Sequence, residues 1–187
     1  MHAIHRALDA FFTARIGIRV LIGHYNELAA AGTAGLGEDL AVGKVGLISE
    51  STVASHVTED AAADAMSMCE RELGVTPQVE FLGTNLEQEM AYIPSHLYYI
   101  MFELLKNSLR ATVEHQRKLH GDDFDEDENL PSVKVIIADS IDNEDVVIKV
   151  SDEGGGIRRS DMPRVFSYLF TTVPTHLQAK GPHSQSP

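Results

Sequence analysis

The chain has 187 residues, of which 43% are hydrophobic and 23% charged, a globular composition that excludes wholesale disorder. Its 15 Lys and Arg against 28 Asp and Glu give a formal net charge of −13, which opposes binding to a phosphate backbone, so we expect no nucleic-acid partner. The single cysteine, Cys69, excludes a disulfide framework and a thiolate zinc site, and no apolar run reaches the ~20 residues that span a bilayer.

Apolar residues at spacings of three to five predict one long helix over residues 3–31, which we interpret as a packed helix of a helical bundle. A mitochondrial transit peptide would also be basic and amphipathic, but this aliphatic stripe is too long for a removable leader. Glycines between residues 30 and 37 end the helix. The stripe consists of Ile4, Ala7, Leu8, Phe11, Phe12, Ile16, Val20 and Leu21.

The segments that follow alternate short Val- and Ile-rich strands with amphipathic helices, which is typical of an α/β fold. In chain order we expect a strand at 45–49, a helix at 52–73 ended by Gly74, a strand at 79–82, a helix at 96–119 with Ser95 as N-cap, and an antiparallel pair of strands at 133–138 and 145–151. We also expect a short helix from Ser160 to Tyr168 and, since periodicity is lost beyond Thr172, a disordered tail over 174–187.

Three common ion- or phosphate-binding loops do not fit the sequence. Residues 121–129 hold six acids but lack the EF-hand ligand spacing, so they predict a solvated loop. The dinucleotide fingerprint fails because Arg159 stands at its third glycine. The P-loop fails because Val45 follows Lys44 where a Ser or Thr is needed. A nucleotide would therefore be bound by another kind of loop.

The predicted helix at 96–119 carries a polar face opposite its apolar face. Glu103, Asn107 and Arg110 lie at i, i+4 and i+7, with Lys106 beside them. An ordinary surface helix is the simpler interpretation. However, Asn107 is a poor helix former in a mid-helix position, and a carboxamide oxygen is a suitable Mg²⁺ ligand. Glu103, one turn earlier, could accept a proton from an attacking hydroxyl.

A second motif follows the last predicted strand, where Asp152 precedes three consecutive glycines, Gly154–Gly156. Glycines in a row are costly in chain entropy but let the backbone approach a ligand closely. Asp152 offers an acceptor to an exocyclic amine. A plain flexible turn is the alternative interpretation.

Taken in order, Glu103–Ser108 resembles the N box of the GHKL ATPases, which include histidine kinases, Hsp90, type II topoisomerases and mismatch-repair ATPases, and Ser151–Ile157 resembles their first Gly box. One branch is more similar still, the mitochondrial protein kinases that phosphorylate 2-oxo acid dehydrogenase complexes. The segments that resemble this branch are Arg15–Leu21, Ile93–Leu97, Leu104–Glu114 and Tyr168–Thr172, and Met1–Leu8 resembles plant-type pyruvate dehydrogenase kinases. The resemblance covers residues 1–173.

The resemblance implies that residues 1–43 are part of an N-terminal helical bundle. Residues 44–173 would form a GHKL (Bergerat-type) two-layer α/β sandwich with a mixed sheet, lacking the lid and the second Gly box. The implied function is transfer of the ATP γ-phosphate to serines of the E1 subunit of a dehydrogenase complex, foremost pyruvate dehydrogenase, which inactivates that subunit. The implied setting is the mitochondrial matrix, with the lipoyl domain of the E2 core and a homodimer as further partners.

The same resemblance assigns roles to individual residues, with ATP and Mg²⁺ as cofactors. Glu103 would be the general base, Asn107 would hold Mg²⁺, and Asp152 would hydrogen-bond the adenine amine. The other implied ATP-binding residues are Glu103 itself, Lys106, Arg110, Gly154, Gly156, Thr171 and Thr172. Many pyruvate dehydrogenase kinases carry a His at the position of Tyr99, whereas the branched-chain kinase carries a Tyr, so the choice of substrate stays open.

Two other functions also remain open. One is a histidine kinase-type ATPase domain, although His24 lacks the Glu-x-x-x-Pro sequence that follows a phospho-acceptor histidine. The other is a non-catalytic fragment that binds partners, because against the family pattern the chain looks truncated at both ends. Without a lid, we expect weak, adenine-dominated binding of ADP and ATP alike.

Overall fold

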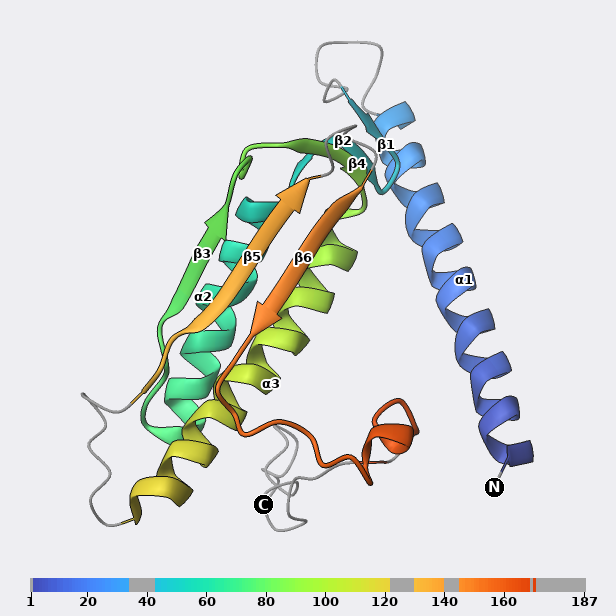
Figure 1. The fold of residues 1–187 in the computed structure, drawn as a ribbon. Helices are drawn as coiled ribbons and strands as arrows, with labels where there is room; N and C mark the ends of the chain where they lie inside the picture. The colour runs from blue at the N-terminus through green and yellow to red at the C-terminus, as the bar shows by residue number, and fades with distance from the viewer. Residues whose placement is uncertain (1, 34–42, 122–129, 140–144, 169, 171–187) are drawn as a thin grey trace, which may run out of the picture. The chain divides into compact units, whose positions relative to one another are not determined.

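The computed structural model of this chain describes residues 2–33, 43–121, 130–139, 145–168 and 170. Its elements are α1 (His2–Thr33), β1 (Lys44–Val45), β2 (Ile48–Val53), α2 (Ala54–Leu73), β3 (Val79–Gly83), β4 (Glu89–Tyr92), α3 (Pro94–His120), β5 (Val133–Asp139), β6 (Val146–Ser151) and a 3₁₀ turn, Met162–Arg164 (Figure 1). The expected α/β class is confirmed.

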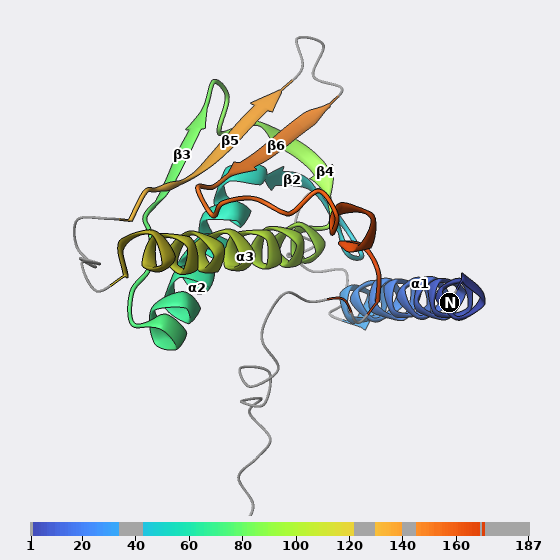
Figure 2. The same ribbon diagram turned by 60° about the horizontal axis from the view of Figure 1, so that its bottom comes forward.

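A mixed sheet of β3, β5 and β6 forms one layer of the fold. The central strand β5 pairs in parallel with β3, from Val79↔Val133 onward, and antiparallel with β6, up to Lys134↔Ser151. The predicted antiparallel pair and the mixed character of the sheet are thus both confirmed. A second, antiparallel sheet contains β1, β2 and β4. Figures 1 and 2 show α2 and α3 side by side on one face of the β3–β5–β6 sheet.

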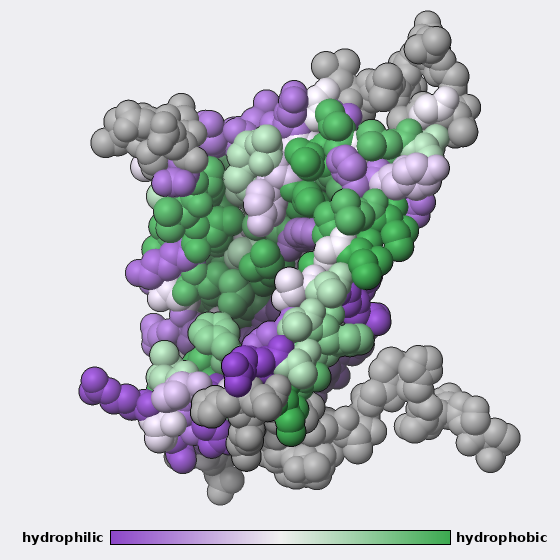
Figure 3. All heavy atoms as spheres, turned by 90° about the vertical axis from the view of Figure 1, so that its right-hand side faces the viewer, coloured by the Kyte–Doolittle hydropathy of each residue, from purple (hydrophilic) through white to green (hydrophobic). Residues whose placement is uncertain are grey.

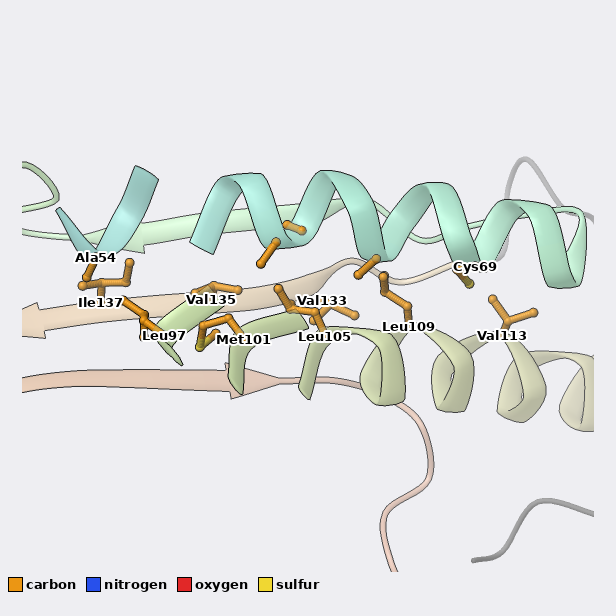
Figure 4. Packing of buried hydrophobic residues seen from close by; sticks show 13 residues of the cluster. Ala54, Cys69, Leu97, Met101, Leu105, Leu109, Val113, Val133, Val135 and Ile137 are labelled. Atoms are coloured by element: carbon orange, nitrogen blue, oxygen red, sulfur yellow. The ribbon is translucent and has the colours of Figure 1, made fainter. Parts of the chain in front are cut away.

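The core lies between α2, α3 and β5, whose apolar side chains point toward one another (Figure 4). Small residues on α2, such as Ala61 and Ala65, let the two helices approach closely, and α3 fills the space with Leu105 and Leu109. Burying a leucine of this kind stabilises the fold by roughly 1.5–3 kcal/mol. The fully or nearly buried apolar residues are Ala54, Ala61, Ala62, Ala65, Cys69, Leu97, Met101, Leu105, Leu109, Val113, Val133, Val135 and Ile137.

Two polar details accompany this core. Burial raises the pKa of the Cys69 thiol above its ordinary value, which fits a packing role. In the second turn of α3, the Tyr98 hydroxyl donates to the Asp64 carboxylate on α2, and this hydrogen bond raises the pKa of Tyr98. The contact joins the two helices at their polar margin.

Some predicted boundaries are wrong. The single strand expected at 45–49 is divided into β1 and β2, because the chain turns at Gly46 with φ +58°. Ser95 is not the N-cap of α3, since the helix begins at Pro94, whose fixed φ suits the first helical position. By contrast, Gly74 ends α2 with φ +82°, and its N–H donates to the Glu70 carbonyl, as predicted.

Two further differences concern short elements. Strand β4 was not predicted, because its four residues carry little apolar pattern. The helix expected from Ser160 to Tyr168 is reduced to the 3₁₀ turn at 162–164, without a side-chain cap. Residues 122–129 and 174–187, for which we expect a solvated loop and a tail, lie outside the described residues.

Helix α1 forms over almost the range that its apolar stripe predicts, but in the described structure the stripe is mostly exposed. Ile4 is 66% and Leu21 70% exposed, and Figure 3 shows broad areas of hydrophobic surface. The packed bundle helix therefore stays a prediction. His24, near the end of α1, accepts a hydrogen bond at Nδ1 from the Leu47 N–H.

The described residues divide into two compact units, one within residues 17–156 and a smaller one in which residues 2–16 associate with residues 157–168 and 170. Within the smaller unit, the Tyr168 ring stacks against His5 and Phe12 and its hydroxyl donates to Asp9. Among the helices that the structure describes, none combines the length and apolarity needed to cross a bilayer.

Candidate active site

The polar face of α3 lies opposite the core-facing leucines, as the helical spacing predicts. Lys106 Nζ lies 2.6 Å from Glu103 Oε1, and Arg110 Nε donates to Glu114 Oε1 at 2.8 Å. The Asn107 side chain is exposed on the same helix. Ion pairs between partly exposed groups on one helix are weak, so Lys106 and Arg110 can exchange these partners for an anionic ligand at little cost.

The turn after β6 is joined to α3 through the Asp152 carboxylate. Ser108 Oγ donates to Asp152 Oδ2 at 2.8 Å, and the Gly154 N–H donates to Asp152 Oδ1 at 2.9 Å. Because Ser108 directly follows Asn107, the two sequence motifs meet at one turn of α3. A carboxylate oxygen can accept more than one hydrogen bond, so Asp152 retains acceptor capacity for a ligand.

The glycines of this turn are required by the packing of the protein itself. A Cβ on Gly154 would lie 2.5 Å from the Ala111 Cβ, and a Cβ on Gly155 would lie 2.6 Å from His115 Nδ1. Gly155 and Gly156 also adopt φ values of +77° and +72°, in the left-handed region that favours glycine. The turn therefore rests directly against α3, and the plain flexible turn that the sequence left open does not describe it.

The glycine turn, Gly154–Gly156, packs on three residues of α3. We call them the support residues: Ser108, Ala111 and His115. They lie at i, i+3 and i+7 and so share one side of α3. Sequence reasoning gave them no role, although their spacing, and the small size of Ala111, would have permitted a prediction of close packing.

The expected site residues that the structure describes lie either on α3 or in the turn after β6. Asp152 and Gly154 are brought into contact with α3, and Glu103 and Lys106 are brought into contact with each other. Gly156 follows in the same turn, while Asn107 and Arg110 share the polar side of α3. Thr171 and Thr172 lie outside the described residues. Tyr99, one turn before Glu103, is exposed.

The donor chemistry of the polar face suits a hard cation. Glu103 and Asn107 present a carboxylate and a carboxamide oxygen one helical turn apart, both accessible to solvent. Mg²⁺ prefers oxygen ligands and commonly takes only one or two protein groups, with water and phosphates completing the shell. Within the described residues, no group of three or more His, Cys, Asp or Glu side chains is arranged to hold a metal.

Comparison with known proteins finds a family match over the part of the chain that contains these residues. Residues 92–184, which include α3 and the glycine turn, match the family of histidine kinase-, DNA gyrase B- and HSP90-like ATPases. The chain is similar to the mitochondrial "[Pyruvate dehydrogenase (acetyl-transferring)] kinase" of Arabidopsis thaliana, at 41% identity over 94% of this chain and 43% of that protein.

Two other relatives carry related names. The mitochondrial pyruvate dehydrogenase kinase of Schizosaccharomyces pombe is 41% identical over 92% of this chain and 37% of that protein. Isozyme 3 of the human mitochondrial enzyme is 34% identical over 89% of this chain and 39% of its own length. The chain thus spans about two fifths of the length of these curated relatives.

Proposed function

We propose that this chain, which belongs to the histidine kinase-, DNA gyrase B- and HSP90-like ATPase family, provides the nucleotide-binding part of an ATP-dependent protein serine kinase. Its substrate is the E1 subunit of a mitochondrial 2-oxo acid dehydrogenase complex, foremost pyruvate dehydrogenase, which phosphorylation inactivates. The observation that carries this proposal is the bond between Ser108 and Asp152, because it joins the glycine turn to the helix of Glu103 and Asn107. The names of the relatives support the substrate.

At the base-binding end, Asp152 accepts a hydrogen bond from the exocyclic amine of adenine. The close packing of Gly154 on Ala111 supports this role, because it keeps the turn that carries Asp152 against α3. Gly156 contributes backbone without a side chain. Thr171 and Thr172 complete the binding residues in this proposal.

At the phosphate end, the cationic side chains of Lys106 and Arg110 on α3 bind the triphosphate. Lys106 leaves its weak pair with Glu103 to contact phosphate oxygens, and Arg110 exchanges Glu114 for the same ligand. Both changes favour the nucleotide electrostatically, and the first also frees the Glu103 carboxylate. Asn107 holds Mg²⁺, which, when bound, neutralises charge that builds on the phosphates during transfer.

Glu103 acts as the general base. Its carboxylate takes the proton from the substrate serine hydroxyl as the serine oxygen forms its bond to the γ-phosphorus and the bond to the β,γ-bridging oxygen breaks. ADP leaves, and phosphoserine remains on the substrate. The chemistry needs mainly positioning and charge neutralisation, which a rigid helix with Glu103 and Asn107 one turn apart supports.

We propose the domain organisation and the partners on the same basis. Residues 1–43 contribute to a helical bundle and residues 44–173 to the ATPase domain, and the protein works in the mitochondrial matrix. The E1 subunit is the substrate, the lipoyl domain of the E2 core is the docking partner, and the kinase forms a homodimer. The names of the relatives support the mitochondrial setting.

Calorimetric titration with ATP and Mg²⁺ tests the nucleotide site. The substitution Asn107→Ala should abolish Mg²⁺-dependent binding while leaving the melting temperature unchanged, because this side chain faces solvent and not the core. The matched control is Lys118→Ala, an exposed position farther along α3, which should bind like the wild type. Equal affinities of Asn107→Ala and the wild type would refute the assignment.

A phosphorylation assay on a dehydrogenase E1 peptide tests the chemical step by comparing the Glu103→Gln variant with the wild type. Binding of ATP should stay near normal, and transfer should slow ~10²–10⁴-fold. Acid-stable phosphoserine on the peptide supports the proposal. Acid-labile phosphohistidine on the kinase itself would instead support the histidine kinase alternative, and full activity of the variant would remove Glu103 as the base.

A further inference from the structure

Ser108 bonds differently from the two buried threonines on the core helices, whereas Ser55 on α2 also donates outside its own helix, at the Leu86 carbonyl. Thr112 Oγ1 donates to the Ser108 carbonyl at 2.9 Å, and Thr58 Oγ1 donates to the Ala54 carbonyl at 2.7 Å. Both bonds run back four residues along the same helix, as is usual for such hydroxyls. Ser108, only 9% exposed, instead donates across to the Asp152 carboxylate on another element.

The result is a carboxylate that is held at both oxygens. Ser108 Oγ donates to Oδ2 and the Gly154 N–H donates to Oδ1, so rotation of the Asp152 side chain would break one bond or both. Asp152 is itself an exposed residue, and an exposed carboxylate without such partners samples several rotamers. The two donors therefore fix the direction of the remaining lone pairs.

The support residues keep the geometry of these two bonds constant. The glycine turn cannot slide toward α3, because Gly154 already contacts Ala111 and Gly155 already contacts the His115 ring. Ser108 lies on the same side of α3 as Ala111 and His115, one turn before Ala111. Helix α3 thus carries the donor, Ser108, and also fixes the position of the turn that carries the acceptor, Asp152.

We propose that Ser108 is a positioning residue, which orients the Asp152 carboxylate to accept the exocyclic amine of adenine and thereby sets a preference for adenine over a 6-oxo purine. The inference rests on the proposed function of Asp152. An oriented carboxylate gains a charge-assisted hydrogen bond from the exocyclic amine and is repelled by an exocyclic carbonyl oxygen at the same place. A carboxylate that rotates freely discriminates less between the two bases.

The test compares ADP with inosine diphosphate, in which an oxygen replaces the amine, by titration of the full chain. Ser108→Ala should lower ADP affinity about tenfold and leave inosine diphosphate affinity unchanged, so the ratio between them falls. Thr112→Val is the matched control, because it removes a buried hydroxyl on the next turn that does not contact Asp152. Ser108→Thr, which retains the hydroxyl, should restore the ratio. An unchanged ratio in Ser108→Ala would overturn the proposal.

A second measurement needs no nucleotide and separates this inference from the proposed function. The exchange of the Gly154 amide hydrogen, followed by NMR, reports its bond to Asp152 Oδ1. Exchange should accelerate in Ser108→Ala and stay unchanged in Thr112→Val. If the wild type binds neither diphosphate, the proposed function fails, while Gly154 exchange still decides whether Ser108 orients Asp152. Exchange that is equal in Ser108→Ala and the wild type would refute that role.

Discussion

Helices α1 and α3 carry similar apolar stripes but meet different surroundings in the described structure. On α3 the apolar residues that face the core are covered by α2 and β5, and Leu105 is completely buried. On α1 the equivalent kind of residue, Leu21, is 70% exposed. The comparison teaches that periodicity specifies that a helix forms and which side is apolar, whereas burial depends on whether a complementary surface packs against it.

The strongest test of this difference is the same substitution in both helices. Leu105→Ala should lower the free energy of unfolding by about 2–5 kcal/mol, because it leaves a cavity among fully packed neighbours. Leu21→Ala, its matched control on α1, should change that free energy by no more than about 0.5 kcal/mol. Urea denaturation of the chain measures both, and similar losses would show that the α1 stripe is buried in solution.

A smaller effect is expected where α3 contacts the glycine turn. Gly154→Ala should destabilise the protein by about 1–3 kcal/mol, because its methyl group would overlap the Ala111 side chain. Adding Ala111→Gly should recover part of the loss, since it removes the nearer of the atoms in the way. If thermal unfolding shows that the double variant is less stable by the sum of both single losses, the two residues are not in contact.

The smallest expected effect concerns the polar margin of α3 and depends on pH. Because the Asp64 hydrogen bond raises the pKa of Tyr98 above 10.0, the folded state favours the neutral phenol. The resulting stability is fully present below pH 10 and is lost as pH rises through the raised value.

Unfolding measurements between pH 8 and pH 11 test whether this contribution to stability is lost as the pH rises. Tyr98→Phe should be slightly less stable than the wild type at pH 8 and should show a shallower decline of stability at alkaline pH. Tyr25→Phe, at an exposed position on α1, is the control and should follow the wild type. Parallel curves for Tyr98→Phe and the wild type would mean that the Asp64 bond is absent in solution.

Local pattern was sufficient to predict much of the fold. The apolar spacing within α3 predicts the helix and the burial of Leu105 and Leu109, although Ile100 and Leu104 in the same pattern are 49% and 48% exposed. Gly74 predicts the end of α2, because a helix cap depends on neighbours within a few residues. Strand β4 was missed since it is short and its pairing with β2 is a tertiary event. Residue type favours Ser95 as the cap, although Pro94 begins the helix.

In the candidate site, too, features set by local sequence could be predicted and features set by tertiary contacts could not. Glu103, Asn107 and Asp152 could be selected from residue type, spacing and resemblance. The partner of Ser108 could not, because it lies 44 residues away and the contact exists only once β6 has paired with β5. The close fit of Gly154 on Ala111 is likewise a property of packing, so the sequence alone allowed a flexible turn there.

The contact between Tyr168 and Asp9 also has a consequence for the order of folding. The two residues are 159 positions apart, so their hydrogen bond closes a loop that contains nearly the whole described chain. Closing so long a loop costs more chain entropy than joining α2 to α3, which are neighbours in sequence. We therefore expect the α2–α3 pair to belong to the folding nucleus and the Tyr168 contact to form after the rate-limiting step. Its loss would then speed unfolding and leave the rate of folding unchanged.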